Sequence, residues 1–481
     1  MKVLTIDLGA TSGRVMTVTH DNHRLSYEEN ARFLNKVKNE NGMLRWDFPY
    51  LFNNIKDGIK KALSEHPDIA SIGIDTWAVD YGFIKNGKLI ENPACYRDTK
   101  SFESQKKLLS VFPFEKIYSI TGIQNLHFNT IYQLYGEDRD FDGLTFLMIP
   151  DLIAYFLTGE ARLEETNASS TSLYNKKEGK ISSELLNAIN IPESIFPKMI
   201  HPGETYGFLK DEFYPEGFKG KIPVVAVGTH DTSSAVLGAS GKGRFAYISS
   251  GTWSLIGTEL KDPIITDDSR TANFTNEIGY NSTIRFLKNT MGMFLINEVR
   301  NDYEAHGVKI PVNDIAKQVY EAKDIHSYLD VNSPLFETPG DMLTKVEDYL
   351  KKTKQDIPST PGEMMKMIYK SMALSYKEII TKLEKLANLK INSILVVGGG
   401  NQASVLNQYT ADACGIEVIT GSSEATVLGN ALAQLIALGD IKDVEEGRND
   451  IASSITSKKF VPNDNEYWES EYANYLTRLH K

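Results

Sequence analysis

Each half of the chain contains the same pattern of strand, turn and strand. LTIDLGATSGRVMTV starts at Leu4, and FAYISSGTWSLIGTE occupies residues 245–259. In both stretches, strand-forming residues lead into small polar residues around a glycine and then into a second strand-like run. Ile6-Asp7-Leu8-Gly9 aligns with Ile248-Ser249-Ser250-Gly251, which indicates two related halves. The repeat restricts the chain to folds built from two similar units.

The same order of elements continues in each half. In the first, short strand-like runs within residues 3–25 precede a segment with helical periodicity at 50–63 and a buried strand at 69–75. In the second, a long helical segment at 364–386 precedes a strand at 392–397. Strands followed by a helix and a further strand predict an α/β fold.

The length of 481 residues exceeds what one ordinary core needs and predicts two domains. We place their boundary near residue 240. The expected N-terminal domain covers 1–240, the C-terminal domain 241–450, and a tail 451–481, whose packing the sequence does not indicate. A cleft between two domains is the first place to expect a binding site.

Charge and composition exclude several classes of protein. A formal net charge of -11 argues against a nucleic-acid partner, because an extended phosphate surface requires a basic face. Two cysteines, Cys95 and Cys414, cannot form a disulfide framework or a cysteine metal cluster. The N-terminus turns polar at Asp7, too early for a signal peptide, and no stretch of about 18 apolar residues marks a membrane span. We expect a cytoplasmic, soluble protein without a membrane partner.

The turn after the first strand combines a carboxylate, small residues and a base. Backbone N–H groups of residues 10–14 can cradle phosphate, while Asp7 can hold Mg²⁺. Thr252 lies in the matching turn of the second half, which predicts a second phosphate loop. No Walker pattern occurs in the chain. The same residues also fit two tight strand connections, the first with a solvated aspartate.

A third glycine-rich turn has two interpretations. Residues 397–400, Val-Gly-Gly-Gly, follow a predicted strand and allow close approach of a nucleotide to the backbone. Gly398, Gly400 and Ala403 also match G-x-G-x-x-A, with Glu417 near the expected distance of about 20 residues, which keeps an NAD-dependent oxidoreductase as a competing class. A zinc site at His20 and His23 has little support, because the two histidines flank a turn.

Two further segments place polar side chains beside strands. Trp77 follows a buried strand with Asp75 and Asp80, and its indole fits either the apolar face of a sugar or the core. In AVGTHDTSSAV, a strand-like run ends at Gly228 and Asp231 follows directly. Asp231 suits a general base that receives a proton from a hydroxyl in phosphoryl transfer, or a helix N-cap.

Taken in order, these segments resemble one family. DLGATSGR, GIDTWAVDYG, YRDTK, GIQNLHFNTIYQL, TNASSTSLY, AVGTHDTSSAV, ISSGTWSLIG, FLKNTMG and VVGGGNQ resemble the FGGY carbohydrate kinases between residue 3 and about residue 430. The resemblance implies two RNase H-like domains of the actin, Hsp70 and sugar-kinase type that flank a catalytic cleft. It implies an ATP- and Mg²⁺-dependent kinase for the terminal hydroxyl of a ketose, with L-rhamnulose the expected substrate.

The resemblance also assigns roles to individual residues. Asp231 corresponds to the general base and Asp7 to a metal-supporting carboxylate. The sugar-binding positions correspond to Trp77, Ala78, His230, Thr232 and Asn289. The nucleotide-binding positions correspond to Ala10, Thr11, Ser12, Gly13, Arg14, Thr252, Asn297 and Gly399.

Three positions depart from the family pattern. Ala78 stands where the family usually has glycine at a position that touches the sugar, so an added methyl group is expected to narrow the pocket or shift its preference. Asn297 stands where glutamine is usual, and Leu126-His127 replaces an aromatic or aliphatic residue followed by proline. L-fuculose, D-xylulose and glycerol therefore stay alternative substrates. A kinase-like sugar sensor without turnover is the alternative outside enzymes.

Overall fold

The computed structural model describes residues 1–241 and 243–479, which form two compact units. Unit 1 comprises Met1–Ser240, Glu259–Phe286 and Glu424–Ile455. Unit 2 comprises Gly241–Thr258, Leu287–Ser423 and Thr456–Lys481. Both units are therefore assembled from several chain segments. The contiguous ranges expected from the sequence, 1–240, 241–450 and 451–481, stay a prediction about domains.

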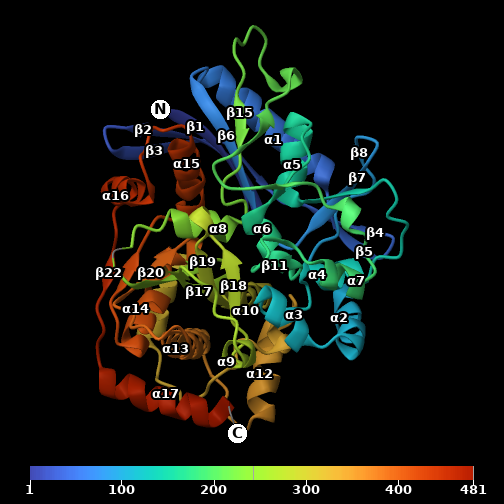
Figure 1. Cartoon of the computed structure of the whole chain (residues 1–481). Coiled ribbons are helices and arrows are strands. Elements are labelled where there is room, and N and C mark those ends of the chain that lie inside the picture. Colours follow the sequence, from blue (N-terminus) through green and yellow to red (C-terminus); the bar gives the residue numbers. More distant parts are fainter. Residues whose placement is uncertain (242, 480–481) are drawn as a thin grey trace. The chain divides into compact units, whose positions relative to one another are not determined.

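Unit 1 is built on a six-stranded sheet with the order β14-β15-β6-β1-β2-β3 (Figure 1). β1 pairs antiparallel with β2 and parallel with β6, and β6 pairs parallel with β15. The strands are β1 (Lys2–Leu8), β2 (Ser12–Asp21), β3 (Arg24–Leu34), β6 (Ile69–Thr76), β14 (Thr205–Phe208) and β15 (Pro223–Val225). Parallel pairing places the carboxyl ends of β1, β6 and β15 at one edge of the sheet.

Helices cover both faces of this sheet. α1 (Phe48–Glu65) links β3 to β6 and buries Leu51, Ile55 and Ile59, one apolar face of the predicted helix. α15 (Ala425–Ala437) comes from the second half of the chain and packs on β1, β6 and α8 (Asp231–Leu237). A Cβ added to Gly429 would lie 1.8 Å from the Ser234 carbonyl oxygen, so glycine permits the crossing of α8 and α15.

A second sheet, of seven strands, repeats this plan with the order β18-β19-β17-β16-β20-β21-β22. β16 pairs antiparallel with β17 and parallel with β20, which pairs parallel with β21. The strands are β16 (Phe245–Ser250), β17 (Trp253–Leu260), β18 (Thr275–Ile278), β19 (Ile284–Met291), β20 (Ser393–Val397), β21 (Val418–Thr420) and β22 (Lys459–Phe460). β1 and β16 hold the same place in the two orders, so the predicted internal repeat and the α/β class are confirmed.

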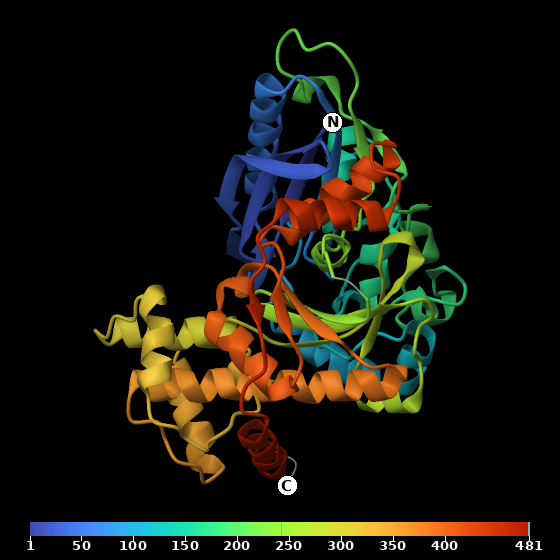
Figure 2. The ribbon, with the colours of Figure 1, turned by 90° about the vertical axis from the view of Figure 1, so that its left-hand side faces the viewer.

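The C-terminal residues complete unit 2. α13 (Pro361–Ala387) is the long orange helix in Figure 2, and α17 (Asn465–Leu479) packs on it and on α14 (Ser404–Cys414). Lys370 of α13 and Glu471 of α17 form an ion pair of 2.7 Å in which both side chains are nearly fully buried. From Thr456 onwards, the tail therefore packs on unit 2.

The remaining elements are insertions into the two sheets. Between β6 and β15 lie β7 (Tyr81–Lys85), β8 (Lys88–Leu89), β9 (Thr145–Met148), β10 (Leu163–Glu164), β11 (Tyr174–Asn175), β12 (Lys180–Ile181), β13 (Met199–Ile200), α2 (Lys100–Val111), α3 (Phe114–Thr121), α4 (Thr130–Tyr135), α5 (Ile149–Thr158), α6 (Glu165–Ala168) and α7 (Ser183–Ala188). Elsewhere lie β4 (Val37–Glu40), β5 (Met43–Trp46), α9 (Asp267–Thr271), α10 (Phe294–Ala305), α11 (Ile315–Glu321), α12 (Met342–Lys352) and α16 (Val444–Ser454). Within the described ranges, every helix is too short or too polar to cross a bilayer.

Candidate active site

Three carboxylates gather where β1, β6 and β15 end in unit 1. Asp7 of β1 lies opposite Asp75 of β6 in the parallel register. Asp231 begins α8 just after β15, and His230 forms a β-bridge with Thr76 of β6. The side chain of Asp7 is 2% exposed and that of Asp231 is 27% exposed, so Asp231 is the member of the group that a substrate can reach.

The carboxylates repel one another electrostatically. Burial raises the pKa of Asp75 well above its ordinary value, and the negative charge of Asp7 raises it further. Burial also raises the pKa of Asp7, although the Arg14 guanidinium opposes this shift. The Oδ2 atom of Asp75 accepts a hydrogen bond of 2.6 Å from Asn430, whereas its buried Oδ1 has no hydrogen-bond partner among the described residues.

This carboxylate group fits a divalent cation. Mg²⁺ prefers carboxylate oxygens, and a positive ion would relieve the repulsion between Asp7 and Asp75 and satisfy the unpaired oxygen. The sequence pointed to Asp7 but assigned no metal role to Asp75. The signal that could have found it is the parallel register, which brings the aspartates of IDLG and GIDTW to adjacent strand ends.

The turn predicted to be the first phosphate loop joins β1 to β2. The Gly9 amide donates to the Ser12 carbonyl oxygen at 3.0 Å, and a Cβ added to Gly13 would lie 2.4 Å from the Leu8 side chain. Arg14 donates to Asp7 at 2.5 Å and also to Glu424 at the start of α15. Arg14 therefore fixes the strand end that carries Asp7, while Ala10, Thr11 and Ser12 are at least partly exposed.

Asp231 is the first helical residue of α8 and not its N-cap. His230 occupies the N-cap position and makes no side-chain capping bond, so the N-cap interpretation of Asp231 is wrong. The Thr232 hydroxyl donates to Asp231 Oδ1 at 3.1 Å, and His230 Nε2 lies 3.5 Å from the same oxygen. Burial raises the pKa of Asp231, while the His230 charge opposes that shift.

Behind His230 lies a buried ion pair that sequence reasoning missed. His230 Nδ1 is 3.1 Å from Glu277 Oε2, and Arg285 Nη2 lies 3.0 Å from the same oxygen and 3.2 Å from His230 Nδ1. Arg285 is 0% exposed and also donates twice to the carbonyl oxygen of Ile278. Arg285 and His230 lower the pKa of Glu277 to about 2 despite its burial, so the carboxylate stays ionised and can hold the imidazole beside Asp231.

A second buried carboxylate fixes the backbone before His230. Glu164 accepts hydrogen bonds from the hydroxyl and amide of Thr166, from the Asn167 amide, and from the hydroxyl and amide of Thr229. The Thr229 carbonyl oxygen in turn accepts from the Thr76 amide at 2.8 Å. The TNASS segment thereby orients the residues that carry His230 and Asp231.

The segment after β6 is strained and partly exposed. Trp77 is 4% exposed and donates its indole N–H to Asp80 at 3.0 Å, so its ring belongs to the core on at least one side. Val79 has a φ of 68°, a left-handed conformation that β-branched residues rarely adopt. Such strain persists where surrounding contacts enforce it and often marks a functional site. Ala78, next to this residue, is partly exposed.

Unit 2 brings three of the predicted nucleotide-binding residues together. The Phe294 amide at the start of α10 donates to the Thr252 carbonyl oxygen at 3.3 Å, and Asn297 lies one turn further along α10. A Cβ added to Gly400 would lie 1.9 Å from Ser250 Oγ, so the turn containing Gly399 packs directly on the turn before Thr252. Asn289 lies on β19 and is partly buried.

The dinucleotide interpretation does not fit this geometry. Gly398 and Gly400 lie at the carboxyl end of β20, where a dinucleotide phosphate would bind. Glu417 precedes β21 at its amino end, and its carbonyl oxygen accepts from the Ile394 amide near the start of β20. The acidic residue is therefore at the opposite edge of the sheet from the glycines.

Comparison with known proteins agrees with this arrangement. The FGGY family of carbohydrate kinases matches with its N-terminal domain over residues 2–238 and its C-terminal domain over residues 246–438. The chain belongs to this family. A rhamnulokinase from Ligilactobacillus salivarius (strain UCC118) is 38% identical over 99% of both chains. A rhamnulokinase from Bacillus subtilis (strain 168) is 39% identical over 95% of both.

Solved structures of the same fold include more distant sugar kinases. A Plasmodium falciparum glycerol kinase with ADP aligns over 100% of this chain and 97% of its own, with a TM-score of 0.81 and 14% identity. A Lactobacillus acidophilus xylulose kinase aligns over 99% of this chain and 96% of its own, with a TM-score of 0.78 and 17% identity. The expected sugar-kinase fold with two related halves is confirmed.

Proposed function

We propose that this FGGY carbohydrate kinase transfers the γ-phosphoryl group of ATP to the terminal hydroxyl of L-rhamnulose. Relatives named rhamnulokinase, 38% and 39% identical over nearly the full chain, support the sugar, and the family supports ATP as the donor. The observation that carries the reaction type is the partly exposed Asp231 beside two buried carboxylates. Since ATP is the donor, we place the protein in the cytoplasm.

In the proposed step, the sugar hydroxyl oxygen attacks the γ-phosphorus. A new phosphorus–oxygen bond forms, the bond to the β,γ-bridging oxygen breaks, and ADP leaves with that electron pair. The hydroxyl proton passes to Asp231, whose raised pKa improves its match to neutral pH as an acceptor. Because the transition state of phosphoryl transfer is loose, the proton can move late.

The remaining residues bind and orient the reactants. His230, Thr232, Trp77, Ala78 and Asn289 are assigned to the sugar. The nucleotide-binding set is Ala10, Thr11, Ser12, Gly13, Arg14, Thr252, Asn297 and Gly399. Asp7 and Asp75 would hold Mg²⁺, which when bound supplies positive charge that neutralises phosphate oxygens.

A substrate panel tests the assignment. Purified protein is given ATP and Mg²⁺ with L-rhamnulose, L-fuculose, D-xylulose or glycerol, and the phosphorylated product is identified by mass and NMR. We expect the highest kcat/KM with L-rhamnulose and phosphate on its terminal oxygen. A higher kcat/KM with another sugar would overturn the substrate, and Ala78→Gly in parallel would show whether the methyl group sets the preference. No turnover with any of them would favour a sugar sensor.

A further inference from the structure

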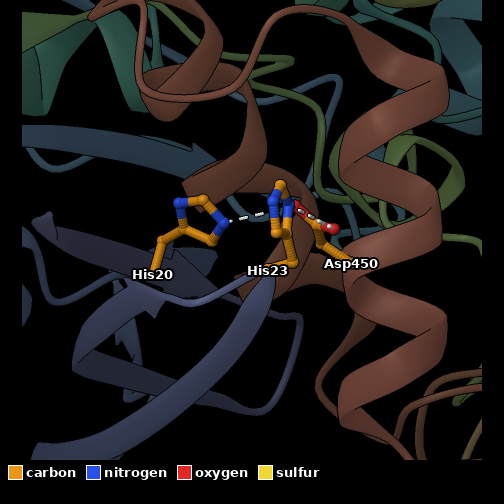
Figure 3. A group of neighbouring side chains, drawn as sticks. All are labelled: His20, His23 and Asp450. Atoms are coloured by element: carbon orange, nitrogen blue, oxygen red, sulfur yellow. Dashed lines mark hydrogen bonds and ion pairs between the residues drawn. The ribbon is translucent and has the colours of Figure 1, made fainter.

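A group of metal-ligating side chains lies in unit 1 outside the candidate active site. His20 is near the end of β2, and His23 follows in the turn to β3. Asp450 belongs to α16, more than 400 positions later, and dashed lines mark the contacts of its carboxylate with both imidazoles (Figure 3). The three ligand atoms lie within 4.8 Å of one another.

The spacing of these atoms suits a tetrahedral zinc ion. His20 Nε2 is 3.2 Å from Asp450 Oδ2, and His23 Nδ1 is 3.4 Å from Asp450 Oδ1. With zinc bonds of about 2.0–2.2 Å to nitrogen and oxygen, two ligands of a tetrahedron are roughly 3.3–3.5 Å apart. Each separation is close to this edge length but runs to a different oxygen of Asp450, and one ligand atom from each of the three residues lies within 4.8 Å of the others, so the side chains would close around a shared zinc ion.

Neighbouring carboxylates complete the arrangement. His20 Nδ1 lies 2.7 Å from Asp440 Oδ2, so its Nδ1–H can donate to Asp440 when Nε2 binds a metal. Metal-binding histidines usually have such a carboxylate partner, which fixes the tautomer and the ring orientation. Glu446 lies one helical turn before Asp450 and 3.8 Å from His23 Nδ1, within reach as a fourth ligand.

Three carboxylates surround the two imidazoles. Asp440, Glu446 and Asp450 face the two imidazoles, and within the described residues Asp450 pairs with His20 and His23. The N-terminal amine is 3.9 Å from Asp440.

We propose that His20, His23 and Asp450, with Glu446 as a fourth ligand, bind Zn²⁺. Imidazole nitrogen ligands select zinc over Mg²⁺, which prefers oxygen. The ion would tie the β2–β3 hairpin to α16 and so join the first and last segments of unit 1. The earlier expectation of little support for zinc rested on the two histidines alone and lacked the carboxylates of α16.

Zinc titration of the full-length, chelator-treated protein tests the proposal. Binding is measured by competition with a chromophoric zinc chelator, with millimolar Mg²⁺ present. We expect one equivalent of Zn²⁺ to bind, and His23→Asn to weaken that binding by at least about tenfold. Asparagine tolerates the left-handed backbone at residue 23 (φ 58°), so this variant should fold.

Control variants separate this site from other zinc ligands. His306→Asn changes an exposed histidine of unit 2 and should leave zinc affinity unchanged. His66→Asn removes the histidine from a second group of possible metal ligands, which also contains Glu28 and Glu65, and should leave the zinc affinity unchanged as well. The absence of stoichiometric binding, or equal affinity in wild type and His23→Asn, would overturn the proposal. Kinase turnover should not differ between these variants.

Discussion

The ion pair behind His230 gives a prediction that connects stability with catalysis. Glu277→Gln keeps the shape of the side chain but removes the negative charge that faces Arg285 and His230. The pKa of Glu277 is lowered from 4.5 to about 2, and each unit corresponds to about 1.4 kcal/mol. Glu277→Gln is therefore expected to lower the free energy of unfolding at pH 7 by about 3 kcal/mol. This agrees with the roughly 3–5 kcal/mol lost when one partner of a buried ion pair is removed.

The pH dependence of this stabilisation has a defined sign. A carboxyl group whose pKa is lowered by folding stabilises the folded state above its unfolded pKa. The contribution of Glu277 should therefore be complete above about pH 5 and be lost as the pH falls toward about 2. Denaturant unfolding of wild type and Glu277→Gln at pH 7 and pH 4 measures both the size and the trend.

Kinetics distinguish positioning of His230 from stability alone. We expect Glu277→Gln to raise KM for the sugar more than KM for ATP, since the imidazole loses the partner that orients it. Glu277→Gln combined with Arg285→Met removes both charges and should recover part of the lost stability. Glu178→Gln, at an exposed ion pair, is the matched control and should change stability by less than about 1 kcal/mol. If Glu277→Gln lowered the free energy of unfolding by a similarly small amount and left KM for the sugar unchanged, Glu277 would neither stabilise the fold nor position His230.

Three further predictions concern the carboxylates and the glycine turn. Asp75→Asn should raise the Mg²⁺ concentration needed for half-maximal turnover, measured by titrating the metal. An unchanged Mg²⁺ concentration would show that Asp75 does not bind the metal. The pKa of Asp231 is raised above 3.8, so kcat/KM should begin to decrease at a pH above 3.8 as the pH is lowered. A kcat/KM that stays constant down to pH 3.8 would exclude Asp231 as the base. Gly400→Ala places a methyl group 1.9 Å from Ser250 Oγ, so it should lower the free energy of unfolding by about 1–3 kcal/mol and raise KM for ATP. An unchanged unfolding midpoint would contradict the close packing.

The repeated pattern of strand, turn and strand made the fold predictable from the sequence. Periodicity found α1 and α13 to within a few residues: α1 buries one apolar face, and α13 is long and is buried on all sides over residues 367–377. The assignment of chain segments to the two compact units was harder to predict from the sequence. α15 and α16 pack with unit 1 although they lie between β21 and β22 in the chain, and glycines at 238 and 429 allow a tight crossing of α15 with α8.

Candidate site residues were found where they follow strands in short motifs. Asp7, Asp231 and the glycine turn at 398–400 all lie at carboxyl ends of strands, where sheet geometry gathers them. Glu277 and Arg285 escaped notice because each is an isolated charge in a strand. Their importance depends on a three-dimensional contact with His230 that no local spacing reveals.

The most direct test of the account is ADP release with L-rhamnulose, ATP and Mg²⁺ by wild type and Asp231→Asn in parallel. Circular dichroism and thermal unfolding of both proteins establish that the fold is intact. General-base catalysis typically contributes a factor of about 10²–10⁴, so kcat should fall by that factor in Asp231→Asn while ATP binding stays near normal. Turnover within a few-fold of wild type in a folded Asp231→Asn protein would contradict the central claim.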